Sequence, residues 1–133
     1  MFRKIEHLGI AVNNMDEALK IYEDLLGQSC YKVETVESEF VKTAFIQVGE
    51  SKIELLEATH PDSSIAKFLE RRGQGFHHVA FDVENIDDEI ERLKAKGFEL
   101  INTTAKDGAD NKRIAFLYPK STNGLLVELC QEK

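Results

Sequence analysis

The sequence of 133 residues contains only two cysteines, Cys30 and Cys130. Two thiols are too few for a disulfide-stapled scaffold or for a zinc site built from thiolates. No segment approaches the roughly 20 consecutive apolar residues that a membrane-spanning helix requires. The opening residues, MFRKIEHLGIAV, include an apolar run shorter than the core of a signal peptide, and no small-residue cleavage site follows. We therefore expect a soluble, cytoplasmic protein.

The sequence also lacks any run of lysine or arginine, and its formal net charge is −7. A nucleic-acid-binding protein needs a basic stripe that neutralises phosphates, so the composition argues against that class. Hydrophobic residues make up 42% and charged residues 31%, as in an ordinary globular protein. The length predicts a single domain over residues 1–133, or two very small modules that share a core.

The chain contains an internal repeat. Three blocks of the first half align with three of the second: IEHLGIAVNNMDEAL (5–19) with FHHVAFDVENIDDEI (76–90), AFI (44–46) with AFL (115–117), and IELL (53–56) with VELC (127–130). The first two blocks align at one shift of 71 positions, and the third follows a turn that is three residues longer in the second copy. One shift across separated blocks indicates a duplication.

Each copy has the same order of elements, namely a strand, a helix and three further strands. Apolar residues alternate in the strand segments and recur at helical spacing in the helix segments. Asn14 and Asn85 are suitable N-caps for the two helices, and Gly27 and Gly97 are suitable ends. The expected strands lie near 4–12, 30–37, 41–48 and 52–57 in the first copy and near 76–83, 98–104, 113–118 and 125–131 in the second.

Module one therefore covers about 4–60, a linker helix covers 62–73, and module two covers about 75–131. Neither copy alone could bury a sufficient core, so the two sheets should combine. The predicted fold class is α+β, with two tandem βαβββ modules that form a curved, barrel-like mixed sheet around a metal site.

The repeat selects one histidine of the pair in GFHHVAFDV. His78 aligns with His7, and small residues lie beside both on their strand faces, which leaves room for a ligand. His77 points to the opposite face, together with Val79 and Phe81, because neighbouring side chains alternate along a strand. We therefore expect His77 to be structural.

Glu54 and Glu128 are also matched by the repeat, and each interrupts an apolar strand. Burying a carboxylate costs several kcal/mol unless a cation or a metal accompanies it. No lysine or arginine repeats with these glutamates. We interpret His7, Glu54, His78 and Glu128 as an N₂O₂ site for a divalent transition metal, with open positions for water or substrate.

A histidine that opens a βαβββ unit, used twice, with a glutamate in each last strand, resembles the vicinal oxygen chelate superfamily, which includes glyoxalases, bleomycin resistance proteins and dioxygenases. The blocks EHLGIAV, VKTAFIQVGESKIELLE, DSSIAKFLERRGQGFHHVAFDV and RIAFLYPKSTNGLLVELCQ are similar to the methylmalonyl-CoA epimerase family. The likeness extends over nearly the whole chain. The IELLE, GFHHVAF and PKSTNGLLVELC blocks make it more specific than the superfamily motif alone.

The resemblance implies that His7, His78 and Glu128 are metal ligands and that Glu54 takes the fourth position. It implies cobalt as the metal, with manganese, nickel or zinc as variants. The implied activity interconverts (R)- and (S)-methylmalonyl-CoA in propionate metabolism, by proton abstraction alpha to the thioester and a metal-stabilised enolate. A carboxylate near the metal can take this proton, so Glu128 is our first candidate base and Glu54 the second.

The resemblance also implies a further catalytic glutamate near Lys42 and Thr43, but that strand has no acid here. The nearest acids are Glu37 and Glu39, which precede the strand, so the second base stays open.

An acyl-CoA substrate carries phosphates, and the basic residues expected to meet them are Lys112, Arg113 and Lys120. Duplicated βαβββ proteins of this size often pair, so we expect a homodimer. Whether each metal site lies within one chain stays open.

Two alternatives stay open as well. Glyoxalase I (lactoylglutathione lyase) would use the same types of ligand and a similar enediolate. A metal-free small-molecule binding or resistance protein of this fold commonly lacks the full ligand set, and all four positions are occupied here.

Overall fold

The computed structural model describes residues 1–133. The chain divides into two compact units. The first unit is His7–His77, and the second unit combines Met1–Glu6 with His78–Lys133. The division falls within two strands, so the first six residues belong with the C-terminal half of the chain. The predicted limits of module one, about 4–60, instead place residues 4–6 with the first half of the chain.

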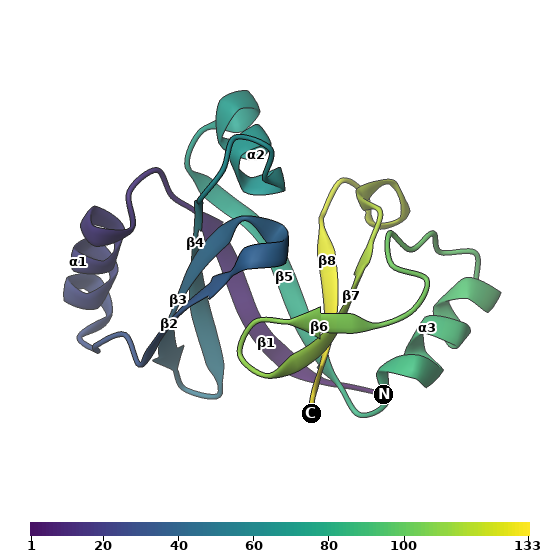
Figure 1. The fold of residues 1–133 in the computed structure, drawn as a ribbon. Helices are drawn as coiled ribbons and strands as arrows, with labels where there is room; N and C mark the ends of the chain where they lie inside the picture. The colour runs from purple at the N-terminus through teal and green to yellow at the C-terminus, as the bar shows by residue number, and fades with distance from the viewer. The chain divides into compact units, whose positions relative to one another are not determined.

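Eight strands and three α-helices make up the fold (Figure 1). The strands are β1 (Phe2–Ala11), β2 (Lys32–Val36), β3 (Val41–Val48), β4 (Ser51–Ala58), β5 (Gly75–Val83), β6 (Lys106–Gly108), β7 (Lys112–Leu117) and β8 (Val127–Glu132). The helices are α1 (Met15–Leu26), α2 (Ser64–Arg72) and α3 (Ile86–Ala95), with short 3₁₀ turns η1 (Glu37–Glu39) and η2 (Pro119–Thr122). The strand order is β2-β3-β4-β1-β5-β8-β7-β6.

The same topology occurs twice. β1 pairs in parallel with β4, and β5 pairs in parallel with β8, whereas the hairpin strands of each half pair antiparallel. β1-α1-β2-β3-β4 and β5-α3-β6-β7-β8 are therefore two βαβββ modules in one mixed sheet. The predicted fold class is confirmed.

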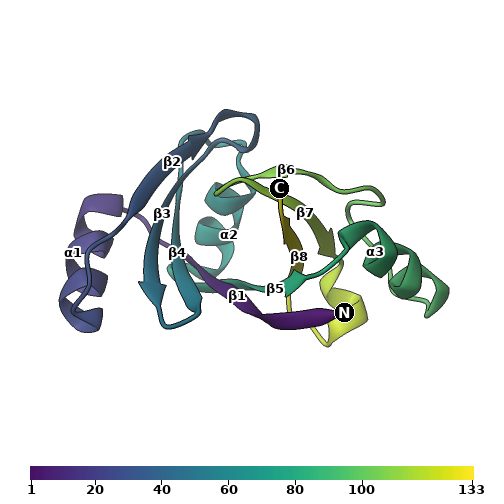
Figure 2. The same cartoon turned by 90° about the horizontal axis from the view of Figure 1, so that it is seen from below.

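In the first unit, α1 covers one face of the sheet, and α2 covers part of the other (Figure 2). Met15 and Ala18 of α1 pack on Ala44 and Leu55 of the sheet, whereas Ile65 of α2 packs on Leu56. Leu55 and Leu56 are neighbours on β4, so the strand buries both of its faces. The predicted linker helix, 62–73, is confirmed as α2.

In the second unit, α3 contacts β7 and β8. Ile86, Ile90 and Leu93 are buried along one side of this helix. Alternate residues of the strands, including Leu117 and Leu129, are buried as well. This apolar packing holds the helix on the strands that carry Glu128.

The two predicted N-caps form, whereas the C-cap of α3 is Lys96, one residue before the predicted Gly97. The side chain of Asn14 accepts a hydrogen bond from the Glu17 amide at 3.0 Å, and Asn85 accepts one from Asp88 at 3.1 Å. Gly27 ends α1 with a φ of 68°, a left-handed conformation that glycine adopts without steric cost.

The strand predicted at 98–104 is wrong. The chain there makes one isolated bridge, Leu100 to Leu117, and the short strand β6 lies further on. The side-chain oxygen of Asn102 accepts from the backbone N–H of Phe116 at 2.9 Å. This bond takes a donor that a continuing β-ladder would need, so side-chain bonding replaces the strand here.

Candidate metal centre

The first unit brings His7 and Glu54 together. β1 and β4 run parallel in a register that places Gly9 beside Glu54, two residues beyond His7. His7 Nε2 lies 3.2 Å from Glu54 Oε1, and each residue is only 5% exposed. Two polar side chains thus meet within the buried part of the first unit.

The second unit repeats this arrangement. β5 and β8 run parallel with Ala80 beside Glu128, again two residues beyond the histidine. His78 Nε2 lies 2.9 Å from Glu128 Oε1, and both residues are buried. The second pair is therefore held by the same local register as the first.

The strand on the other side of each glutamate also follows the repeat. Phe45 on β3 stands directly opposite Glu54, and Phe116 on β7 stands directly opposite Glu128. The Phe116 ring lies edge-on to the His78 ring, with centroids 5.7 Å apart. Each His–Glu pair thus has a phenylalanine beside its carboxylate, which limits its contact with water.

His77 lies apart from these pairs. Its ring packs edge-on against Phe68 of α2, with centroids 4.8 Å apart. This contact with the linker helix agrees with the structural role expected from strand alternation.

The donor atoms of the two pairs suit a divalent transition metal. Each pair offers one imidazole nitrogen and one carboxylate oxygen. Such a nitrogen and oxygen set suits zinc, cobalt, nickel and manganese better than calcium or magnesium. The residues present therefore fit the predicted cofactor.

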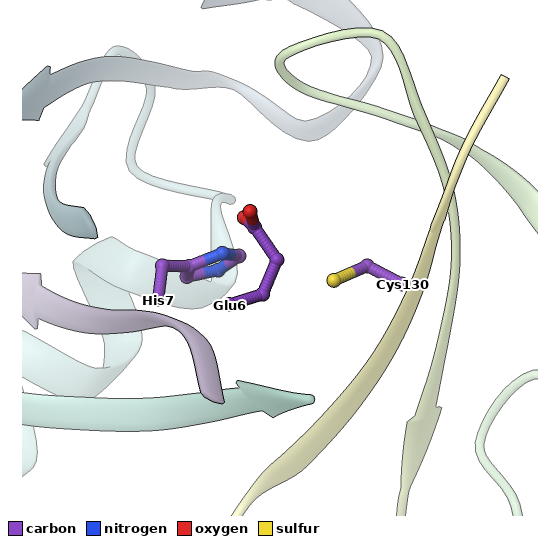
Figure 3. A group of neighbouring side chains, drawn as sticks. All are labelled: Glu6, His7 and Cys130. Carbon is purple, nitrogen blue, oxygen red and sulfur yellow. The ribbon is translucent and has the colours of Figure 1, made fainter. Parts of the chain in front are cut away.

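Glu6 was not identified from the sequence. It is 2% exposed, and Figure 3 shows it extending from β1 in the second unit, where Cys130 extends its sulfur from β8. A carboxylate oxygen of Glu6 and Cys130 Sγ lie within 4.8 Å of each other. Cys130 Sγ also donates to the Phe81 carbonyl at 3.5 Å. The sequence offered no signal for Glu6 except that it precedes His7. Strand alternation places Glu6 on the face of β1 opposite to His7, so the sequence analysis did not include it.

Two of the three basic residues expected to bind CoA are held by surface ion pairs. Arg113 donates to both carboxylate oxygens of Asp87, at 3.0 and 3.1 Å, and this bond raises the pKa of Arg113. Lys120 Nζ lies 2.8 Å from Glu99, and this hydrogen bond raises the pKa of Lys120. Both groups stay positively charged at neutral pH.

Lys112 differs from these two, because it is only 7% exposed. It stands opposite Glu132 on β8, and its Nζ lies 3.7 Å from that carboxylate. Alternation places Glu132 on the same strand face as Glu128, so Lys112 shares that face and Arg113 does not.

A family model for the Glyoxalase/Bleomycin resistance protein/Dioxygenase superfamily matches residues 6–116. An ethylmalonyl-CoA/methylmalonyl-CoA epimerase from Cereibacter sphaeroides is 36% identical, with 98% of this chain and 99% of the relative covered. The chain is an enzyme of the methylmalonyl-CoA epimerase family. The predicted family is therefore confirmed.

A solved structure and a further relative are also similar to this chain over nearly its whole length. The structure of the Streptomyces coelicolor enzyme in complex with 2-nitronate-propionyl-CoA matches with a TM-score of 0.96 at 30% identity, covering 99% of this chain and 96% of that chain. YqjC of Bacillus subtilis, described as uncharacterized, is 42% identical over 98% of this chain and 93% of its own length.

No helix of the structure is long and apolar enough to span a membrane.

Proposed function

We propose that the protein is a metal-dependent epimerase that interconverts (R)- and (S)-methylmalonyl-CoA. The observation that carries the proposal is the pair of buried His–Glu contacts, at 3.2 and 2.9 Å, in one repeated strand register. The names of the relatives support the substrate, because the Cereibacter and Streptomyces proteins are both epimerases of this type.

His7, Glu54, His78 and Glu128 would hold one divalent cation between them. When bound, the cation stabilises the negative charge that develops on the thioester oxygen as the neighbouring C–H bond breaks. Burying a carboxylate is costly unless a cation accompanies it, so a bound cation would offset the cost of burying Glu54 and Glu128.

The residues of the chain would move the proton. Glu128 is our first candidate to remove or return it on one side of the α-carbon, acting as a general base and then as an acid. Glu54 is the candidate retained from the sequence for the other side. Phe45 and Phe116 would limit access of water to the reacting carbon.

Three finer features belong to the same proposal. Cobalt is the metal that the family resemblance implies, with manganese, nickel or zinc as substitutes. We also expect a homodimer, because duplicated βαβββ proteins of this size often pair, and a cytoplasmic protein that acts in propionate metabolism. Metal analysis of protein purified without chelator and native mass spectrometry would test the first two.

The decisive experiment follows each epimer of methylmalonyl-CoA with chelator-treated protein, before and after addition of cobalt. We expect inversion of both epimers only with metal. The same preparations are assayed with the glutathione–methylglyoxal adduct, because two relatives at 29% and 27% identity are named probable lactoylglutathione lyases. Turnover of only that adduct would reject the epimerase, and absence of both metal binding and turnover would favour a binding protein.

A further inference from the structure

The sheet face that carries His7 and Glu54 carries one more acid, Glu34 of β2. Glu34 stands opposite Thr43 of β3, and Thr43 stands opposite Leu56 of β4. Directly opposed side chains of antiparallel strands share a face, and residues two apart on one strand do as well. Glu34 therefore lies on the face of Leu56 and Glu54.

Two neighbours contact Glu34, Lys32 at its carboxylate and Thr43 at its backbone carbonyl. Lys32 Nζ lies 3.3 Å from Glu34 Oε1, and the Thr43 hydroxyl donates to the Glu34 carbonyl at 3.1 Å. The Glu34 side chain is 31% exposed, whereas Glu54 is nearly inaccessible at 7%. Glu34 is thus held by its neighbours and still open to a ligand.

The other acids of these strands are placed differently. Glu57 of β4 lies on the opposite face, where it accepts a hydrogen bond from the Met15 amide at 2.9 Å. Glu37 and Glu39 lie in the exposed turn η1. Within the first unit, Glu34 is the only strand acid besides Glu54 on the face of His7.

The repeat is broken at this position. The second unit has Ile114 where the first has Thr43, and the residue opposite Ile114 is Lys106. The histidines, glutamates and phenylalanines of the two units match, but Glu34 and Lys106 carry opposite charges. Inversion of a chiral carbon requires a proton-transferring group on each of its two sides, and the broken repeat shows that Glu34 is not simply a copy of a residue in the second unit.

The spacing suits an acyl group between Glu34 and the metal ligands. β2 and β4 are separated by β3, so their backbones lie about 10 Å apart at a strand spacing of about 4.8 Å. On this face of β3, Phe45 stands opposite Lys32 and Glu54, and Thr43 stands opposite Glu34 and Leu56. One apolar ring and one hydroxyl therefore lie between the strand of Glu34 and the strand of Glu54.

We propose that Glu34, in place of Glu54, is the second catalytic acid–base residue and exchanges a proton with the α-carbon of the acyl-CoA; this rests on the proposed function. The Glu34 carboxylate takes the α-hydrogen as a proton, and the electrons of the broken C–H bond pass into the enolate. A second acid, protonated and on the other side of the α-carbon, then forms the new C–H bond. Glu34 leaves this turnover protonated and the other acid ionised, and the reverse reaction or solvent exchange restores both.

The test compares E34Q with a matched control, E37Q, which alters an exposed acid of the same hairpin. Each variant is given each epimer in D₂O, and inversion and deuterium uptake are measured separately. General acid–base groups contribute about 10²–10⁴-fold, so we expect E34Q to lose inversion by this factor. E34Q should still exchange deuterium into one epimer without inverting it, and E37Q should behave as wild type.

Cobalt affinity by calorimetry and the thermal midpoint should be unchanged in E34Q, which would exclude a merely structural effect. If wild type is active and E34Q loses less than about threefold, far below the general-acid contribution, the assignment of Glu34 is rejected and the proposed function stands. Equal loss of exchange from both epimers would reject it too. An inactive wild type would reject the proposed function and Glu34 with it.

Discussion

Gly9 is the cross-strand neighbour of Glu54, and Ala80 holds the same relation to Glu128. The two smallest side chains thus lie where a larger one would crowd a His–Glu pair. Ala80 is fully buried, so a longer side chain there would have no solvent into which to turn. The two copies of the repeat therefore match both in the proposed ligands and in the small residues beside them.

His78 and His77 provide a matched test of metal binding. Replacing His78 by alanine removes a proposed ligand, and we expect cobalt affinity to fall at least about 100-fold, since losing even a group that only orients a ligand costs about 10–100-fold. His77→Ala removes the contact with Phe68 and should leave affinity unchanged. Calorimetry of both variants checks this, and equal losses would contradict the assignment of His78.

Lys112 and Arg113 lie on opposite faces of β7, so replacing each of them tests which face meets the CoA. Lys112→Ala removes a buried basic group on the face of Glu128, so we expect KM for the acyl-CoA to rise about 10-fold, as for a lost charged hydrogen bond of about 1.5 kcal/mol. Arg113→Ala removes a group held by Asp87 on the other face, and KM should not change. Steady-state kinetics with varied acyl-CoA measures both. A rise for Arg113→Ala alone would place the CoA on the opposite face.

The sequence predicted the residues of the His–Glu pairs because the two copies of the internal repeat can be aligned. The histidines match at a shift of 71 positions and the glutamates match after the turn that is three residues longer, and neither match required knowledge of strand pairing. The repeat does not identify Glu34, because its place on the sheet face of His7 and Glu54 depends on which residue of β3 it opposes. Register of this kind depends on turn geometry and packing, which the alternation pattern of a single strand does not contain.

The missing strand at 98–104 has a related cause. Its residues alternate as a strand would, but Asn102 bonds the backbone of β7 with its side chain. Side-chain competition for backbone donors is a tertiary event, so periodicity could not reveal it. Most other elements were predicted because their caps and apolar spacing act locally.

Glu89 should make stability depend on pH in the acid range. Burial raises the pKa of Glu89, but hydrogen bonds from Arg92 and the N-terminal ammonium outweigh it and hold the pKa below 4.5. Its stabilising contribution is therefore present above about pH 4.5 and lost as the pH falls through the lower folded-state pKa. We expect Glu89→Gln to cost about 1.5 kcal/mol at pH 7, the low end for hydrogen bonds to charged groups.

Urea unfolding of wild type and Glu89→Gln between pH 7 and pH 3 measures this difference. It should shrink as the pH falls, because wild type loses the ionised carboxylate as well. Glu91→Gln, whose carboxylate is 74% exposed beside Lys94, is the control and should show no such trend. A cost for Glu89→Gln that is constant over the whole range would refute the assignment.

Asn14 and Asn85 should stabilise their helices without taking part in the chemistry. Each side chain accepts a hydrogen bond from an amide in the first helical turn, at 3.0 and 3.1 Å. Removing such a cap leaves that donor without its partner, so alanine at either position should cost about 1 kcal/mol in free energy of unfolding. Asn13→Ala is the control, because Asn13 uses only its backbone N–H, toward Gln74. Chemical denaturation gives the unfolding free energies, and epimerisation of the folded variants should equal wild type. If Asn13→Ala cost as much as Asn14→Ala, the loss would belong to the loop before α1 and not to the cap.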